Sequence, residues 1–187
     1  MRTLNQIKYK KFIFVMLKYK GYLGPNLRSI DSSLYPYLIG KRGEKCFYDL
    51  NKSTIGIKQM LEFFENIVVE RGRILLVGGS IPLVSVLLCL GVGYDSNLRV
   101  IPWTFSRISK TSHQDFLIIH EVDKKAVLEA YGKMLPMSGT HYPSIQGISY
   151  PINVNLASTG VFNWYSWGIV SSYRRGRYRR LRGHYEI

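Results

Sequence analysis

Acidic residues are absent from the first 30 positions of this 187-residue chain, and only Glu186 lies among its last 15. The formal net charge is +14, yet residues 31–172 carry 13 basic side chains against 11 acidic ones. The excess charge therefore resides mainly at the two ends. A nearly neutral body with basic ends is typical of proteins that bind a phosphate backbone or an anionic membrane surface.

Cysteine is scarce as well. Cys46 and Cys89 are far apart, and neither belongs to a CxxC motif or a Cys/His cluster. This spacing argues against a zinc site and favours a reducing compartment. The histidines are too scattered to suggest a metal site, and we expect no metal and no cofactor. They are His113, His120, His141 and His184.

Long apolar runs are also lacking. Phe12–Leu17 is too short for the core of a secretory signal, and Ile81–Leu90 is too short to span a bilayer. Val154–Val170 contains asparagines and serines, which favours a buried helix. The acid-free start is compatible with a mitochondrial presequence, although it is rich in Lys and Tyr rather than Arg and Ser. Synthesis inside an organelle or an uncleaved import signal would fit equally, and we expect no membrane association.

Apolar content is 46%, which predicts a globular body. Residues 54–71 show helical periodicity, with Gly72 as the expected terminator. RILLVGG, residues 73–79, is typical of a strand buried on both faces. The apolar face of the predicted helix comprises Ile57, Met60, Leu61, Phe64, Ile67 and Val68, while Lys58, Glu62 and Glu65 should be solvated.

Helices and strands alternate further along the chain. The pattern predicts helices over 81–90, 124–135 and 157–173, with Pro82 and Asp123 at the starts of the first two, and Ala126, Val127, Ala130 and Tyr131 as the apolar face of the second. It predicts strands over 98–103, 115–121 and 137–142. We therefore expect an α/β fold with three α/β/α layers and a mainly parallel sheet. This domain, 21–172, would lie between a basic extension, 1–20, and an Arg-rich tail, 173–187.

The body holds weak signals for catalysis. LLVGGSIP, residues 75–82, could form an anion site at a helix N-terminus, but it lacks GxGxxG and a P-loop lysine. A tight turn at Gly78 and Gly79 is favoured, and a nucleotide-binding α/β enzyme using this loop is the alternative hypothesis. HEVD, residues 120–123, has no nucleophile or second base tied to it by spacing. Trp164 and Trp167 are predicted to be core residues. We expect no enzyme activity and no small-molecule substrate.

The tail, YRRGRYRRLRGHYEI, has no apolar stripe at helix or strand spacing. We predict that it stays extended until a polyanion binds it. An arginine guanidinium can donate two hydrogen bonds to the oxygens of one phosphate, and tyrosine rings can stack on exposed bases. Because both ends carry the same charge, RNA binding is favoured over a solvated end. The candidate RNA-binding residues are Lys8, Lys10, Lys11, Lys18, Lys20, Arg28, Lys41, Arg42, Tyr173, Arg174, Arg175, Arg177, Tyr178, Arg179, Arg180 and Arg182.

LYPYLIGKRGEKCFYDLNKST, residues 34–54, resembles the signature of the universal small-subunit ribosomal protein S-two family. In that family a Pro-Tyr, a Gly-x-Arg turn and an Asp-Leu-x-Lys-Ser/Thr lead into the first long helix. GYLG at 21–24 is similar to the family's Gly-His-Leu-Gly. RGRILLVGG at 71–79, DFLIIHEVDKKAVLEA at 115–130 and ISYPINVN at 148–155 follow in the family's order. The matching signature residues are Pro36, Tyr37, Gly40, Arg42, Asp49, Leu50, Lys52 and Ser53.

The chain departs from the family in several places. Tyr22 stands where the family has histidine, Gly43-Glu44 replaces Asn-Gly, and the segment at 99–103 hardly matches Trp-Leu-Gly-Gly. Only a short link, about 109–114, occupies the place of the bacterial helical hairpin. These departures indicate a divergent organellar form, with the matrix of mitochondria as the expected location and another organelle or a bacterium as the alternative.

The resemblance implies a three-layer α/β/α fold and a role without catalysis. That role is binding small-subunit ribosomal RNA and neighbouring ribosomal proteins near the junction of head and body. In bacteria the family also helps to recruit the messenger-binding protein S-one. Because the hairpin is missing here, the resemblance leaves open whether this chain makes that contact.

Overall fold

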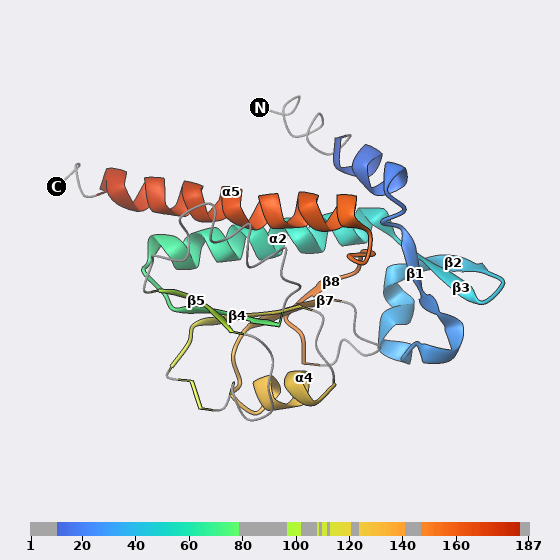
Figure 1. Cartoon of the computed structure of the whole chain (residues 1–187), viewed down its shortest axis with the longest axis horizontal. Coiled ribbons are helices and arrows are strands. Elements are labelled where there is room, and N and C mark those ends of the chain that lie inside the picture. Colours follow the sequence, from blue (N-terminus) through green and yellow to red (C-terminus); the bar gives the residue numbers. More distant parts are fainter. Residues whose placement is uncertain are drawn as a thin grey trace.

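A computed structural model of the chain describes residues 11–78, 97–101, 108, 110, 111, 113–120, 124–140 and 147–183. Its centre is a sheet of five parallel strands in the order β5-β4-β6-β7-β8 (Figure 1). This confirms the predicted α/β class. The strands are β4 (Ile74–Gly78), β5 (Leu98–Ile101), β6 (Phe116–His120), β7 (Met137–Thr140) and β8 (Tyr150–Ile152).

Both faces of the sheet are covered. Side chains alternate along β4, so that Ile74 and Leu76 pack with helices α2 (Leu50–Val69) and α5 (Thr159–Gly183). Leu75 and Val77 pack on the opposite face, where α4 (Lys124–Tyr131) lies (Figure 1). The continuous apolar run of β4 follows from this arrangement, because a strand between two helical layers has no solvated face.

Helix α2 begins at Leu50, four residues before the predicted start, because the Asp49 carboxylate caps it by accepting from the Asn51 and Lys52 amides. At its other end Arg71 takes the left-handed conformation, with φ of 60°, and the Gly72 amide donates to the Ile67 carbonyl. This is the Schellman pattern. The prediction that Gly72 terminates the helix is therefore wrong in detail, because Arg71 takes the left-handed position. Gly72 serves for close approach, since a Cβ there would lie 2.5 Å from Ile67.

The predicted buried face of α2 is confirmed for Ile57, Met60, Phe64, Ile67 and Val68, and Leu61 is partly buried against the same core. Lys58 and Glu62 are exposed as predicted. The prediction for Glu65 is wrong, because its side chain is only 13% exposed.

The apolar face of α4 is confirmed at Val127 and Ala130. Tyr131 instead ends the helix 60% exposed. The helix therefore stops four residues short of the predicted end at Leu135.

A small antiparallel sheet lies beside α2 and was not predicted. It has the order β1-β3-β2 and consists of β1 (Leu23–Asn26), β2 (Leu38–Arg42) and β3 (Lys45–Tyr48). Two short 3-10 turns, η1 (Leu27–Ser29) and η2 (Ser32–Tyr37), separate β1 from β2. Irregular register, half-buried side chains on β1 and mostly exposed side chains on β2 hide these strands from periodicity. β8 was likewise not predicted to be a strand.

Part of the predicted N-terminal extension belongs to the folded body. Residues 11–18 are helical, and Phe12 and Met16 lie in the main core. The Phe12 ring meets the edge of Trp164 with centroids 4.7 Å apart. Of the two tryptophans expected in the core, Trp164 is half-buried, whereas Trp167 is 53% exposed, so that prediction is wrong for Trp167.

The last helix does not end near Tyr173 as predicted, because α5 continues to Gly183. The expectation of an extended tail is therefore wrong for residues 173–183. α5 runs along α2 (Figure 1), and Tyr173 is 2% exposed against Phe64. Burial of Tyr173 and close approach at Gly176 give this segment an apolar side, which the many arginines around these residues conceal in the sequence.

Several predicted features lie outside the described residues. They are Lys8, Lys10, the turn at Gly79, the helix over 81–90 with Pro82 and Cys89, the last two residues of the predicted strand over 98–103, the link residues Ser109 and Ser112, the HEVD residues Glu121, Val122 and Asp123, and the end of the tail, 184–187.

Candidate nucleic-acid interface

The tail arginines are arranged by the helix that carries them. Residues four apart lie on one side of a helix. Arg174, Tyr178 and Arg182 therefore form one row along α5, which we call the outer row. Arg175 and Arg179 form the adjacent row, which we call the inner row.

The inner row faces helix α2. Arg175 Nε donates to Glu65 Oε2 at 2.8 Å, and an Arg179 terminal nitrogen donates to Glu65 Oε1 at 3.1 Å. A terminal nitrogen of Arg175 also donates to the Ser172 hydroxyl at 2.8 Å. Each carboxylate oxygen of Glu65 thus has its own arginine. Charge-assisted pairs of this kind are stronger than neutral hydrogen bonds.

Two opposing effects act on the Glu65 carboxylate. Burial alone would raise its pKa, but the hydrogen bonds and positive charges of Arg175 and Arg179 outweigh burial and lower the pKa below its usual value of 4.5. Glu65 is therefore ionised at neutral pH and serves as the counterion of the inner row.

The outer row is turned toward solvent. Arg174 and Arg182 are exposed, and Tyr178 is 55% exposed. The Arg182 guanidinium lies 4.6 Å from the centroid of the Tyr178 ring, a cation–π distance. Within the described residues the structure records no ion pair between an acid and either arginine of this row. The row combines two available positive charges with an aromatic face.

The remaining tail residues have other surroundings. Tyr173 is buried, so the prediction that it could contact RNA is wrong. Arg177 is exposed, with its guanidinium 5.9 Å from the Tyr173 ring centroid.

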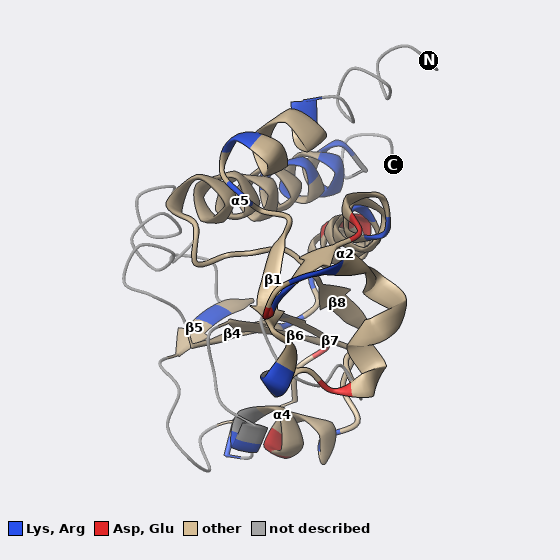
Figure 2. Cartoon of the chain, turned by 90° about the vertical axis from the view of Figure 1, so that its right-hand side faces the viewer, with Lys and Arg blue, Asp and Glu red and all other residues tan. Residues whose placement is uncertain are grey.

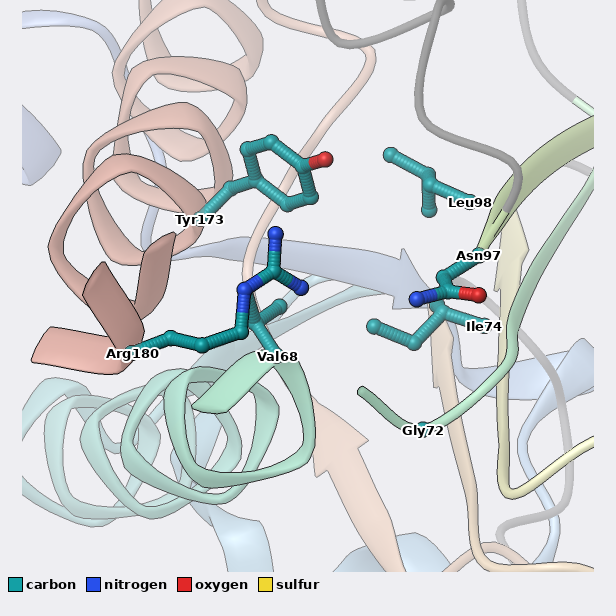
Figure 3. A pocket seen from close by; sticks show the side chains of 7 residues that line it. All are labelled: Val68, Gly72, Ile74, Asn97, Leu98, Tyr173 and Arg180. Carbon is teal, nitrogen blue, oxygen red and sulfur yellow. The ribbon is translucent and has the colours of Figure 1, made fainter. Parts of the chain in front are cut away.

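Arg180 is half-buried and lines a small pocket with Tyr173 and Asn97 (Figure 3). The pocket holds about 180 Å³ with open solvent included. This is less than the roughly 300–1,000 Å³ of typical ligand sites. We therefore do not regard it as a nucleotide site.

Most of the other candidate residues that the structure describes lie on two further elements. Lys11, Lys18 and Lys20 are exposed on or just after the helix over 11–18, and Lys41 and Arg42 are exposed on β2. The β2–β3 hairpin and the C-terminal end of α5 lie at opposite ends of the molecule (Figure 1). Figure 2, in which Lys and Arg positions are blue, shows basic residues on separate elements of the ribbon. The structure therefore does not gather those predicted residues that it describes into one patch.

Arg28, another candidate, forms an exposed ion pair with Glu44 at 3.3 Å. Pairs as exposed as this one contribute little to stability. The Arg28 side chain is 89% exposed, in the turn η1 that follows β1.

The signature residues have structural roles where the structure describes them. Lys52 Nζ donates to the Pro36 carbonyl at 2.5 Å, and the Ser53 hydroxyl donates to the Asn153 carbonyl at 2.5 Å. The Asn155 amide donates to the Gly21 carbonyl at 2.9 Å. Three segments that are distant in the sequence, around 21, 36–53 and 153–155, thus meet at one junction.

The end of β4 was the strongest candidate for catalysis. Gly78 has a φ of 79° and pairs in register with His120 of β6. His120 is fully buried, with its ring 5.1 Å from that of Phe162. Among the described residues there is no group of three or more His, Cys, Asp and Glu side chains able to hold a metal.

Sequence reasoning missed Glu65 as a functional residue. Its helical position among exposed charges indicates a solvated acid, and its partners lie more than a hundred residues away. No signal within α2 could reveal them.

A scan against protein-family models finds no match. A search of curated proteins finds no match either.

No helix in the described part of the chain combines the length and apolar character needed to cross a bilayer.

Proposed function

We propose that this chain is a structural protein of the small ribosomal subunit. It would bind small-subunit ribosomal RNA and neighbouring ribosomal proteins and would not catalyse a reaction. In this proposal it is a divergent mitochondrial member of the S-two family that lacks the helical-hairpin insertion.

The main support for the proposal is that the segments that resemble the S-two family contact one another at one junction. Ser53 of the signature contacts Asn153 of ISYPINVN, and Asn155 contacts Gly21 of GYLG. Matches that occur by chance would be scattered over a fold. Here the matching segments hold one another in place, which supports reading them as parts of one inherited motif set.

The surface chemistry supports the same proposal. Exposed lysines and arginines occupy three separate elements: the helix over 11–18, the β2–β3 hairpin and the outer row of α5. A protein embedded in folded RNA meets phosphates on several sides, whereas a protein that binds one small ligand concentrates its charge at one site. Basic charge spread over both ends of the molecule suits the first situation.

Sedimentation tests the proposal directly. The tagged full-length protein, produced at its natural level, is followed through a sucrose gradient of mitochondrial lysate. We expect it to co-migrate with small-subunit ribosomal RNA and to move to light fractions after ribonuclease treatment. A free soluble pool unaffected by ribonuclease, or recovery with membranes, would contradict the assignment.

A further inference from the structure

The two arginine rows of α5 differ in the partners that their side chains have within the protein. In the inner row, Arg175 and Arg179 each donate to a separate oxygen of Glu65. In the outer row, Arg174 and Arg182 are exposed beside Tyr178. The sequence alone gives no reason to expect that these four arginines differ in their ability to bind RNA.

The Glu65 carboxylate occupies the position that a phosphate would need between the inner arginines. Its side chain is 13% exposed, while those of Arg175 and Arg179 are 56% and 58% exposed. A phosphate approaching the free nitrogens of the inner row would meet the negative charge of Glu65. Displacing Glu65 would leave a largely buried carboxylate without its partners, which is strongly unfavourable.

We propose that Glu65 is an internal counterion that withholds Arg175 and Arg179 from RNA and fixes α5 on α2, so that Arg174 and Arg182 with Tyr178 form the RNA-contacting face. This inference rests on the proposed function, because it assumes that the polyanion bound by α5 is RNA. Glu65 is a positioning residue in this scheme and does not contact RNA itself.

The outer row has the chemistry of a single-strand contact. The Arg182 guanidinium lies over the Tyr178 ring, and the residue is 55% exposed, which leaves ring surface that a base could contact. Arg174 lies one turn earlier and can neutralise a phosphate of the same strand. Stacking on an aromatic ring tolerates every base, so we expect little sequence preference.

The experiment measures how the affinity for RNA depends on salt. The probe is a labelled single-stranded oligouridylate, titrated with the full chain at several salt concentrations. For R174Q/R182Q we expect the log–log slope to fall by about 1.4, which is two phosphate contacts at roughly 0.7 each. For R175Q/R179Q we expect an unchanged slope with a lower melting temperature.

Glu65→Gln should change the salt dependence of RNA binding in the direction opposite to R174Q/R182Q. Removing the counterion frees two arginines, so the slope should rise by up to about 1.4. The matched control is Glu62→Gln, which removes the same charge from the exposed side of α2, where Glu62 pairs with Lys58 at 3.7 Å. We expect the control to leave the slope unchanged. If R175Q/R179Q does not fold, the triple variant E65Q/R175Q/R179Q replaces it, because it leaves no charge unpaired.

The outcomes separate this inference from the proposed function. A slope reduced equally by the inner and outer pairs, or a slope unchanged in Glu65→Gln, overturns the division between the rows. Absence of any salt-dependent binding by the wild-type chain overturns it as well. Wild-type binding with the expected slopes, but without co-migration with the small subunit, supports the division between the rows and contradicts the ribosomal assignment.

Discussion

Gly176 of α5 lies against Val68 of α2 so closely that a Cβ on Gly176 would stand 2.8 Å from the Val68 Cβ. The same added atom would also lie 2.8 Å from the Glu65 carbonyl oxygen. Glycine therefore allows the Arg-rich end of α5 to pack on α2 rather than leave the body.

Replacing Gly176 with alanine tests this contact. Alanine favours a helix by about 1 kcal/mol over glycine, but overpacking against backbone costs about 1–3 kcal/mol. We expect Gly176→Ala to lower the free energy of unfolding, measured by urea denaturation. Gly168→Ala is the control, since its Cβ would meet only the end of the Leu61 side chain at 3.3 Å. Equal stabilisation by both substitutions would show that α5 does not pack closely at Gly176.

The core between α2 and the sheet depends on Phe64, which is completely buried and contacts Phe116. Phe64→Ala should lower the free energy of unfolding by about 3–5 kcal/mol. Ile55→Ala on the same helix removes a side chain that is 57% exposed, and should change stability by less than about 0.5 kcal/mol. A loss below about 1 kcal/mol for Phe64→Ala would place the buried face of α2 elsewhere.

The lowered pKa of Glu65 predicts a pH dependence of stability. A carboxylate whose pKa is depressed by folding contributes stability above its unfolded pKa, near 4.5, and this contribution is lost as the pH falls through the folded pKa. The melting temperature of the wild type should exceed that of Glu65→Gln at neutral pH, and the difference should shrink below pH 4.5. Glu62→Gln should show no comparable difference. A gap between wild type and Glu65→Gln that persists unchanged in acid would contradict the ion pairs with Arg175 and Arg179.

Calorimetric titration with ATP, GTP and NAD addresses the alternative hypothesis of a nucleotide-binding enzyme. The sequence that follows Gly78 lacks the consecutive lysine and Ser/Thr of a P-loop, and His120, which pairs with Gly78, is buried. We expect no binding in the micromolar range. Micromolar affinity that disappears in Gly79→Asp would establish a nucleotide site there.

The central strands β4 and β6 and the α/β class could be predicted from the sequence because their signals are local. ILLVG and FLIIH are short apolar runs, and a strand buried on both faces requires apolar residues at every position. The apolar face of α2 could be predicted for the same reason, since helical spacing alone identifies Ile57, Met60 and Phe64. The net charge likewise identified the arginine-rich end as a candidate contact for a polyanion.

What only the tertiary structure decided is how that end is used. The tail sequence has no apolar stripe, yet burial of Tyr173, close packing at Gly176 and the pairing of Glu65 with Arg175 and Arg179 hold it as a helix on α2. These contacts join residues about a hundred positions apart, so no local pattern contains them. The sequence by itself determined that the arginines carry charge. The packing of α5 on α2 determined which of them oppose an internal acid and which face solvent, because a helix places adjacent arginines on different sides.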